Sequence, residues 1–387
     1  MPPNKRQHYV PKLYLRNFAE DGDIIYSYNF DSNKCNPVSI NSICQESYFY
    51  GQNLEIESQL SQFEGKIAKL YTKILSEKTV KNLNKEELHD LLFSITLQKD
   101  RTRNKRDDGI DLWEYLWVNK YSQFILPLLK SHNLDLDQAN KEILDHSENL
   151  WIFDIIEADI DYPLISDLDI FIVENLSDIN YIIGENPVVL NNNFSLYREY
   201  SSGLQSPGLQ IWFPFHPKLA LLFIDSDSYE YSPTNQDLIQ LSKRIDIEKI
   251  NLLQLFSTGN NLFFSDKSYC PDLIKFVHEN KELKPEKVRE EKILKKIKIR
   301  DKDAQIIAVR LKGYDFNVKF SFLKINHAIN RKLKKYQKDL VLFSKNPPIR
   351  NPRLMSIVDD RDNMVYGDTP FAKGRKMSQI IERTIGG

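Results

Sequence analysis

An imidazole and a guanidinium lie close together near the start of the chain, within a segment rich in aromatic rings. His8 opens a His-Tyr-Val-Pro sequence, and Arg16 comes two residues before Phe18. A histidine titrates near neutral pH and can serve as a general acid or base, whereas an arginine can hold a phosphate or carboxylate group. Because an ordinary N-terminus is polar and frayed, we expect this aromatic one to be tied into a core, with His8 and Arg16 carried into a site. The alternative is a histidine that only caps the following helix or fills the core.

A second group of polar residues closes a predicted helix. Gln98 and Arg101 are three residues apart and Thr102 is four from Gln98, so on a helix the three share one face. The apolar residues before them would bury the opposite face, which lets the polar trio point into a cleft. We expect Arg101 to act in catalysis by holding phosphate, and Gln98 and Thr102 to bind substrate. The alternative is an ordinary charged helix end, where cations suit the helix dipole.

A third group follows an apolar run over residues 181–183. Gly184, Glu185, Asn186 and Pro187 place a carboxylate and an amide at the end of a predicted strand, and loops on rigid scaffolds often carry function. We expect Glu185 to orient His8 or to bind a divalent metal ion, although the spacing does not indicate a metal site, and Asn186 to bind substrate. The alternative is a turn that only ends the strand.

Basic residues gather in the C-terminal part of a chain that is nearly neutral as a whole. Residues 281–350 hold 21 Lys and Arg against 8 Asp and Glu, whereas the full chain has 53 against 54. Such asymmetry indicates a surface for nucleic acid, here residues 285–340, or for another acidic partner. A solvated face, docking on the acidic body, a protein partner and self-assembly are the alternatives. The candidate nucleic-acid contacts are Lys295, Lys296, Lys298, Arg331, Lys332, Lys334 and Lys335.

Length and composition restrict the class of protein. The chain has 387 residues and is 41% hydrophobic, which is enough for a large core. We find neither a transmembrane run nor a secretory signal. Cys35, Cys44 and Cys270 have unrelated spacings, which predicts neither a disulfide framework nor a zinc site. We therefore expect a cytoplasmic protein with reduced thiols, without a membrane partner, and we name no cofactor.

Apolar periodicity predicts the elements that must position these groups. Helices are expected over residues 56–74 and 84–98, the second with an N-terminal capping box, and around 113–128, 138–156, 236–256, 271–278 and 326–340. Strands are expected over 24–30, 169–173, 181–183, 209–215 and 219–224, with a late hairpin over 306–311 and 315–323 after a charged connector at 281–300. The fold class is α+β, with a helix-rich N-terminal half packed against a small mixed or antiparallel sheet. We place a core domain at residues 1–280 and a basic α/β extension, made of hairpin, helix and frayed tail, at 281–387.

The motifs together resemble one family, the bacterial domain of unknown function 4238 family, over roughly residues 4–265. The resemblance lies in the His-Tyr-Val-Pro and Leu-Arg-Asn-Phe sequences of residues 8–18, in Gln98 with Arg101 and Thr102, in the Glu-Asn-Pro-Val turn of residues 185–188, and in the two prolines of residues 214–217. Members often have Ser-Asp-Asn-Pro where this chain has Gly-Glu-Asn-Pro, which lengthens the reach of the carboxylate at Glu185. They often have Pro-Leu-Ser-Pro where this chain has Pro-Phe-His-Pro. The resemblance implies no established reaction.

Two functions of different classes fit these residues. In the first, the protein is a hydrolase of a phosphate-bearing substrate, a nuclease-type bacterial toxin or phage-defence effector, with His8 as acid or base and with Arg101 and Arg16 on the phosphate. In the second, it is a non-catalytic module that binds nucleic acid or protein and has a buried structural network of His, Arg and Glu. An enzyme requires these side chains to converge on an open, wet cleft, whereas the module requires them to be occluded and mutually satisfied.

Overall fold

The computed structural model of the protein combines helices with several sheets, which confirms the α+β class. It describes residues 5–20, 22–52, 54–122, 125–126, 135, 137–142, 144, 155, 158, 161–194, 203–284, 288–299, 302–312, 317–338 and 348–352. The helix predicted over 138–156 lies largely outside the described residues.

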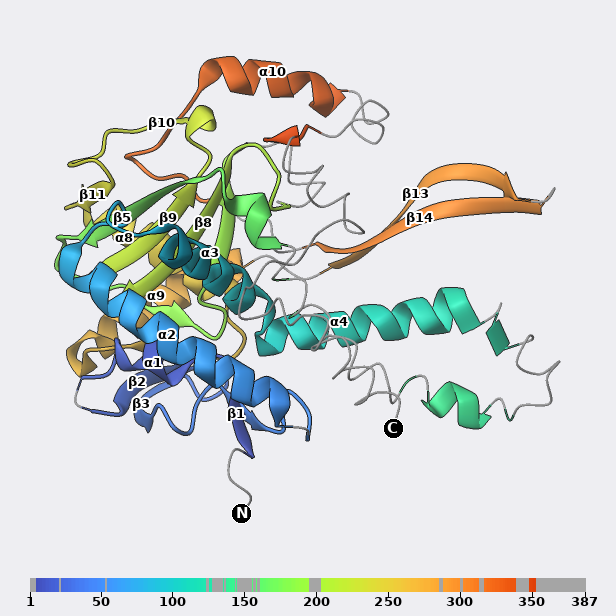
Figure 1. The fold of residues 1–387 in the computed structure, drawn as a ribbon, viewed down its shortest axis with the longest axis horizontal. Helices are drawn as coiled ribbons and strands as arrows, with labels where there is room; N and C mark the ends of the chain where they lie inside the picture. The colour runs from blue at the N-terminus through green and yellow to red at the C-terminus, as the bar shows by residue number, and fades with distance from the viewer. Residues whose placement is uncertain are drawn as a thin grey trace.

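A five-stranded sheet forms the centre of the molecule (Figure 1). All neighbouring strands are antiparallel except the first two, which are parallel. The strands over 219–224 and 209–216 are predominantly apolar and buried almost throughout, as expected of strands covered on both faces. The strands predicted over 169–173, 209–215 and 219–224 are thereby confirmed. In spatial order the strands are β11 (Leu238–Leu241), β5 (Asp169–Asn175), β9 (Leu219–Ile224), β8 (Leu209–His216) and β7 (Val189–Asn192).

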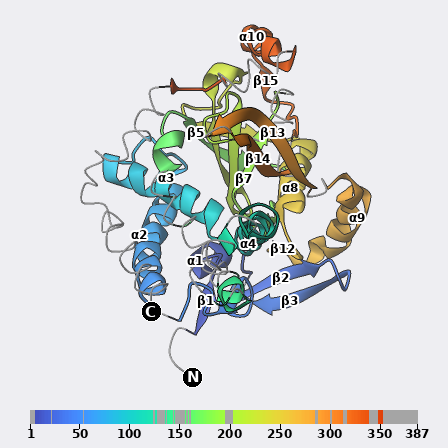
Figure 2. The ribbon, with the colours of Figure 1, turned by 90° about the vertical axis from the view of Figure 1, so that its right-hand side faces the viewer.

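Two long helices, α2 (Glu55–Glu77) and α3 (Lys85–Asp100), cover one face of this sheet (Figure 2). The apolar stripe of α2 faces inward, and its Tyr71 contacts the rings of Phe213 and Phe215 on β8 at centroid distances of 5.9 and 6.1 Å. The predicted capping box opens α3, because Asn84 and Glu87 each accept the other's backbone N–H. Both predicted helices are confirmed.

The opposite face of the sheet is covered by α8 (Arg244–Ser257) and by a stretch from the C-terminal part of the chain. Trp212, which alternates with Phe213 along β8, contacts Phe320 at a centroid distance of 4.8 Å. The carboxylate of Asp246 on α8 accepts bonds from the backbone N–H and the hydroxyl of Ser321. Residues 317–323 therefore share the core of the N-terminal part, while the boundary at residue 280 stays a prediction.

A second sheet packs beside the first and is antiparallel throughout. The helix α9 (Cys270–Asn280) lies against it through Leu273 and Val277, both fully buried. The strand predicted over 24–30 is confirmed, whereas the run at 181–183 contributes only its last residue to a strand. The strands in spatial order are β3 (Lys34–Ser39), β2 (Ile24–Asn29), β12 (Asn261–Phe264) and β6 (Ile183–Gly184).

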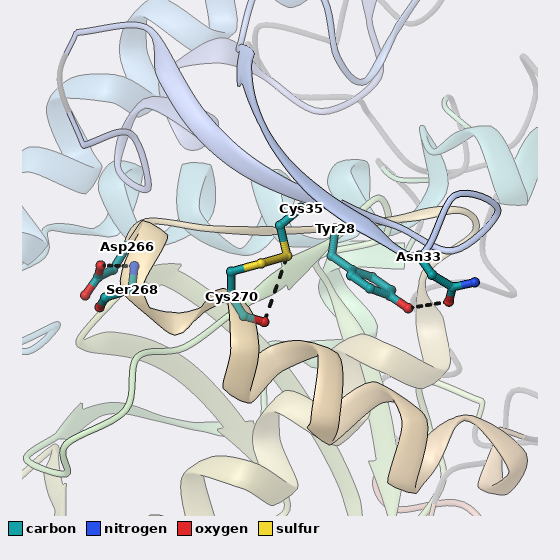
Figure 3. The surroundings of a disulfide bond; sticks show 6 residues. All are labelled: Tyr28, Asn33, Cys35, Asp266, Ser268 and Cys270. Carbon is teal, nitrogen blue, oxygen red and sulfur yellow. Dashed lines mark hydrogen bonds between the residues drawn. A yellow bond between two sulfur atoms is a disulfide. The ribbon is translucent and has the colours of Figure 1, made fainter.

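A disulfide joins this sheet to α9 (Figure 3). It links Cys35 of β3 to Cys270, the first residue of α9, with their Cα atoms 6.2 Å apart. The expectation that all three cysteines are reduced is therefore wrong for these two, and only Cys44 is a free, buried thiol. Spacing could not reveal the pair because 235 residues separate its members in the sequence.

Shorter elements complete the body. The strand β1 (Arg6–His8) pairs with β4 (Gln45–Ser47), and α1 (Lys12–Arg16) begins after Pro11. The strand β10 (Tyr229–Glu230) pairs with β15 (Lys324–Ile325), and α10 (His327–Lys338) follows, which confirms the predicted basic helix. Short 3-10 turns are Tyr162–Ile165, Ser226–Ser228, Lys267–Tyr269 and Lys281–Leu283.

Two elements project from the body on the same side (Figure 1). One is α4 (Arg103–Leu116), continued by a π-helical turn over Trp117–Tyr121, and the other is the two-stranded ribbon of β13 (Val288–Ile299) and β14 (Lys302–Lys312). The ribbon rests on α4 at its root, where Glu291 accepts a bond of 2.7 Å from the Tyr115 hydroxyl and pairs with Lys120 at 2.8 Å.

Two sequence predictions about the order of the elements are wrong. The hairpin uses residues 288–312, so the supposed connector at 281–300 is largely strand, and residues 317–323 pack on the core instead of forming its second strand. The helix predicted over 236–256 begins only at Arg244, because residues 238–241 pair in parallel with β5. This long-range pairing overrides the local apolar period.

Candidate functional site

The N-terminal segment is tied into the core, as its aromatic composition predicts. Tyr9, Tyr14 and Phe18 are all buried, and the Tyr14 hydroxyl donates a 2.6 Å bond to the carbonyl of Pro214 on β8. His8 ends β1 and Tyr9 lies in the bend after it, and the two side chains meet different charged groups. Burial and the charge of Lys12, with that of Arg101, lower the pKa of His8, while burial, with the charges of Cys44 and Glu185, raises the pKa of Tyr9.

Arg101 is the centre of a buried polar network. It caps the end of α3, is 1% exposed, and donates from Nε to Gln98 Oε1 at 3.0 Å and from Nη2 to Glu64 Oε1 at 2.8 Å. Gln98 in turn donates to the carbonyl of Tyr9 at 3.1 Å. Burial lowers the pKa of the Arg101 guanidinium, but the interactions with Tyr50 and Glu64 raise it by more, so the net shift is upward. The network thus fastens the N-terminal segment to α2 and α3.

The predicted trio at the end of α3 is only partly correct. Gln98 and Arg101 share a face and bond to each other, as their spacing predicts. Thr102 is also buried, but it does not join them, because α3 ends at Asp100 and Thr102 starts the next helix. Its hydroxyl accepts the backbone N–H of Lys105 and caps α4.

His8 is a neutral imidazole on the partly exposed side of this network. Its Nε2 bonds to the carbonyl of Ile40 at 3.2 Å, so Nε2 carries the proton and Nδ1 keeps a lone pair. Burial, helped by the charges of Lys12 and Arg101, lowers the pKa of His8 to about 4, although the bond to Ile40 opposes this. Near neutral pH the side chain can accept a proton but has none to give from Nδ1.

Glu185 lies in a separate, buried cluster. Its carboxylate accepts the backbone N–H of Asn260 at 2.7 Å and the side-chain amide of Asn261 at 3.0 Å, while its own N–H donates to Thr258 at 3.0 Å. The charge of Glu185 adds to burial in raising the pKa of the thiol of Cys44. No bond joins Glu185 to His8 or Arg101 in the described part of the chain, so the expected triad is not assembled.

The turn that carries Glu185 is tightly packed against residues 257–259. Asn186 donates its amide to the carbonyl of Ser257, and a Cβ added at Gly184 would lie 2.7 Å from the Cβ of Thr258. Glycine at position 184 is therefore required by the close approach of the two turns. Glu185 and Asn186 are used to hold this contact, and we find no group of three or more His, Cys, Asp or Glu suited to a metal ion among the described residues.

Arg16 is not part of either cluster. It is exposed at the end of α1 and forms a surface ion pair with Asp23 at 3.1 Å. The bond from Arg16 is the main cause that lowers the pKa of Asp23. The predicted pairing of Arg16 with His8 in a phosphate site is therefore absent from this arrangement.

Two acidic residues of α2 belong to the network and were missed in the sequence. Glu64 pairs with Arg101, and Glu57 lies seven residues earlier, on the same face of the helix. Burial, followed by repulsion from Glu64, raises the pKa of Glu57 to about 7, while Arg101 and Lys12 oppose the rise. In the sequence, these two carboxylates lie beside the apolar stripe of α2. They drew no attention because the stripe alone is enough to predict the helix.

The space around Arg101 is small. A cavity of about 20 Å³ lies between Tyr14, Phe63, Glu64, Gln98 and Arg101, which is room for a single water molecule. A groove of about 360 Å³ lies between α8 and α9 and contains none of the predicted site residues. Gln98, Arg101 and Glu185 are thus buried and hydrogen-bonded, whereas His8 is partly exposed and Arg16 is on the surface.

The basic residues of the C-terminal part lie on two elements. Lys295, Lys296 and Lys298 belong to β13, and their side chains, with that of Lys335, lie outside the described part of the structure. Arg331, Lys332 and Lys334 are exposed on α10. No helix in the described ranges is long and apolar enough to cross a membrane.

Comparison with known proteins gives one match. Residues 6–268 match the family model described as "Protein of unknown function (DUF4238)". No curated protein and no solved structure matches the chain.

Proposed function

Because the chain belongs to the DUF4238 family of proteins of unknown function, we propose its function from its own surfaces: it binds nucleic acid through the basic face of α10. The buried network of Arg101, Gln98 and Glu64 then fixes the N-terminal segment. This corresponds to the non-catalytic alternative drawn from the sequence. The observation that carries the proposal is the division of α10 into a docked apolar face and an exposed cationic face.

The described cations of α10 lie on its exposed side. Arg331 and Lys334 are three residues apart, which places them on one face of the helix. Arg331 and Lys334 are exposed, as is Lys332 beside them. None of these three forms an ion pair with a residue that the structure describes. Such a row of unneutralised charges suits the phosphates of a nucleic-acid backbone.

The apolar side of α10 argues against a membrane surface as the partner. Leu333 is only 3% exposed, and Ile329 packs against the main core. A basic amphipathic helix that binds a bilayer must insert its apolar face among the lipids. Here that face is already occupied by the body of the protein, so the helix offers charge alone.

The ribbon β13–β14 supports the same proposal through its position. Lys295, Lys296 and Lys298 lie in its outer half, beyond the root that rests on α4. A two-stranded ribbon has dimensions that fit the major groove of a duplex. The ribbon would therefore extend the contact made by α10, and we assign both to the surface formed by residues 285–340.

A charge-reversal experiment tests this proposal. The variant Arg331→Glu/Lys334→Glu should bind a short fluorescent DNA duplex roughly tenfold or more weakly than the unmodified protein, because phosphate contacts dominate such binding. The control Lys69→Glu/Lys81→Glu makes the same change in net charge at exposed positions of the body, and it should bind nearly as well as the unmodified protein. The assignment would be contradicted if both variants lost the same amount of affinity for the duplex. It would also be contradicted if the unmodified protein did not bind the duplex at all. A single-stranded RNA of the same length tests which nucleic acid is preferred.

One observation favours a second candidate, the hydrolase of phosphate-bearing substrates that would act as a nuclease-type toxin or phage-defence effector. The pKa of Glu57 is raised to about 7 and that of His8 is lowered to about 4, and the charges of Arg101 and Lys12 act on both. Groups whose environments move their pKa values apart are typical of acid and base pairs. Near pH 7, Glu57 could give a proton while His8 accepts one.

This candidate has its own assay. Hydrolysis of a fluorescent RNA and of a DNA duplex would be measured near pH 7, with and without added magnesium. The hydrolase requires turnover that is lost in Glu57→Gln and in His8→Gln and is kept in Glu20→Gln, a change at an exposed residue. Absence of turnover in the unmodified protein, or equal turnover in all variants, would leave the binding function alone.

A further inference from the structure

The C-terminal part of the chain returns to the body after α10 and inserts one arginine into it. Residues 348–351 run without regular structure, and Arg350 contacts two loops of the body, 203–208 and 161–168, the second of which contains the 3-10 turn of Tyr162–Ile165. The side chain of Arg350 is only 6% exposed. We propose that these loops form a binding slot for an arginine-bearing extended peptide, and that the chain's own residues 348–352 occupy it as a detachable strap.

The contacts of Arg350 match the donor pattern of a guanidinium. Its Nε and Nη2 bond to the two carboxylate oxygens of Asp167 at 2.9 and 2.7 Å, which is the bidentate arrangement. Nη2 also donates to the carbonyl of Leu164 at 2.7 Å, and Nη1 to that of Ser206 at 3.4 Å. The backbone N–H of Arg350 donates to the carbonyl of Gln205 at 2.8 Å. A lysine could not make this set of bonds, because it offers a single nitrogen.

The slot is built from body residues that hold each other in place. Gln205 donates its side-chain amide to the carbonyl of Leu164 at 2.6 Å and so connects the two loops. Ser166 donates its hydroxyl and its backbone N–H to the carbonyl of Pro163, and Ser206 donates its N–H to Gly203. These bonds do not involve Arg350, so the slot should keep its shape when the arginine leaves.

The strap, in contrast, lies outside the buried core. None of residues 348–352 belongs to the buried core of the described chain. Prolines at 347, 348 and 352 flank the arginine in the sequence and favour an extended backbone before it is bound. A short segment anchored by a buried arginine is the form of a peptide ligand, and this one is tethered to its receptor. The tether gives it an effective concentration in the millimolar range or thereabouts.

A peptide that corresponds to residues 346–354 tests the proposal. The full-length variant Arg350→Ala should bind this fluorescent peptide saturably, whereas the unmodified protein should bind it roughly tenfold or more weakly because its own strap competes. Replacing the peptide's arginine by lysine or alanine should weaken binding roughly 10- to 100-fold, since several charge-assisted bonds are lost. Adding Asp167→Asn to the Arg350→Ala variant should have a similar effect.

Two results would overturn the proposal. One is a folded Arg350→Ala variant that fails to bind the peptide or binds the alanine peptide equally well. The other comes from hydrogen exchange in the unmodified protein, which needs no variant. The amide of Arg350 should exchange far faster than the amides of β8, because a detachable strap opens without global unfolding. Exchange of both at the same slow rate would show that residues 348–352 are an integral part of the fold.

Discussion

The substitution Glu57→Gln should make the stability of the protein less dependent on pH. The pKa of Glu57 is raised from 4.5 to about 7, chiefly by burial. The folded protein therefore holds a proton that the unfolded chain has already released, so stability falls as the pH rises from about 4.5 to about 7. The penalty is fully present above that range and absent below it. Glutamine keeps the shape of the side chain and cannot ionise.

The magnitude follows from the same pKa difference. At ~1.4 kcal/mol per pKa unit the full effect would be ~3.4 kcal/mol. Because the side chain is only partly buried, solvent screening reduces the expected gain to ~1.5 kcal/mol. The variant should exceed the unmodified protein in unfolding free energy by that amount at pH 8 and should equal it at pH 4.

Urea unfolding at a series of pH values measures this difference directly, with the slope of each transition used to confirm that the same surface is exposed. The control is Glu20→Gln, at an exposed position outside the network, and it should show no such trend. A Glu57→Gln variant that is less stable than the unmodified protein at pH 8 would refute the reasoning. It would mean that the ionised carboxylate gains more from Arg101 and Lys12 than it loses by burial.

Three further predictions concern stability. The variant Arg101→Met should lose ~3–5 kcal/mol in urea unfolding, because Glu64 and Gln98 are left without their buried partner. The double variant Arg101→Met/Glu64→Gln should recover part of that loss, and equal stability of the two variants would contradict the pairing. Under oxidising conditions, Cys35→Ser should lower the unfolding free energy by ~2–5 kcal/mol relative to the unmodified protein. In the presence of a reductant, the variant and the unmodified protein should be equally stable. Asn84→Ala should lower the unfolding free energy by ~1 kcal/mol, because it removes the N-cap of α3. An unchanged unfolding free energy in thermal or urea unfolding would show that the capping box does not stabilise the protein.

Much of the architecture could be predicted from local patterns. The predominantly apolar runs of β8 and β9 are typical of strands buried on both faces, and the Asn84–Glu87 box marks the start of α3. The bond between Gln98 and Arg101 follows from their spacing on one helix. The capping box and the Gln98–Arg101 bond each join residues that are close together in the sequence. The two strands are recognised by their residue types alone, because apolar residues are buried.

The failures share the opposite property. The pairing of β11 with β5 and the Cys35–Cys270 disulfide join residues far apart in the chain, and no local period encodes such contacts. Thr102 was placed on the wrong helix because its residue type suits both a helix face and a helix cap, and only the tertiary structure decides between them. Glu64 was missed because an acidic residue beside an apolar stripe is ordinarily solvated.

The separation of Glu185 from His8 has a simple geometric origin. His8 is the last residue of β1, and Tyr9 begins the bend that follows it. Arg101 acts on His8, and Glu185 acts on Tyr9. The hydrogen bonds of Arg101 and of Glu185 thus belong to two different clusters.

The salt dependence of nucleic-acid binding by the charge-neutral variant Arg331→Gln/Lys334→Gln tests the central claim most directly. If these two cations contact phosphates, the slope of log affinity against log salt concentration should be smaller in magnitude by about 2 than for the unmodified protein, since each contact releases about one counterion. The matched variant Lys69→Gln/Lys81→Gln should keep the original slope. An unchanged slope for Arg331→Gln/Lys334→Gln would show that the basic face of α10 does not bind the phosphate backbone.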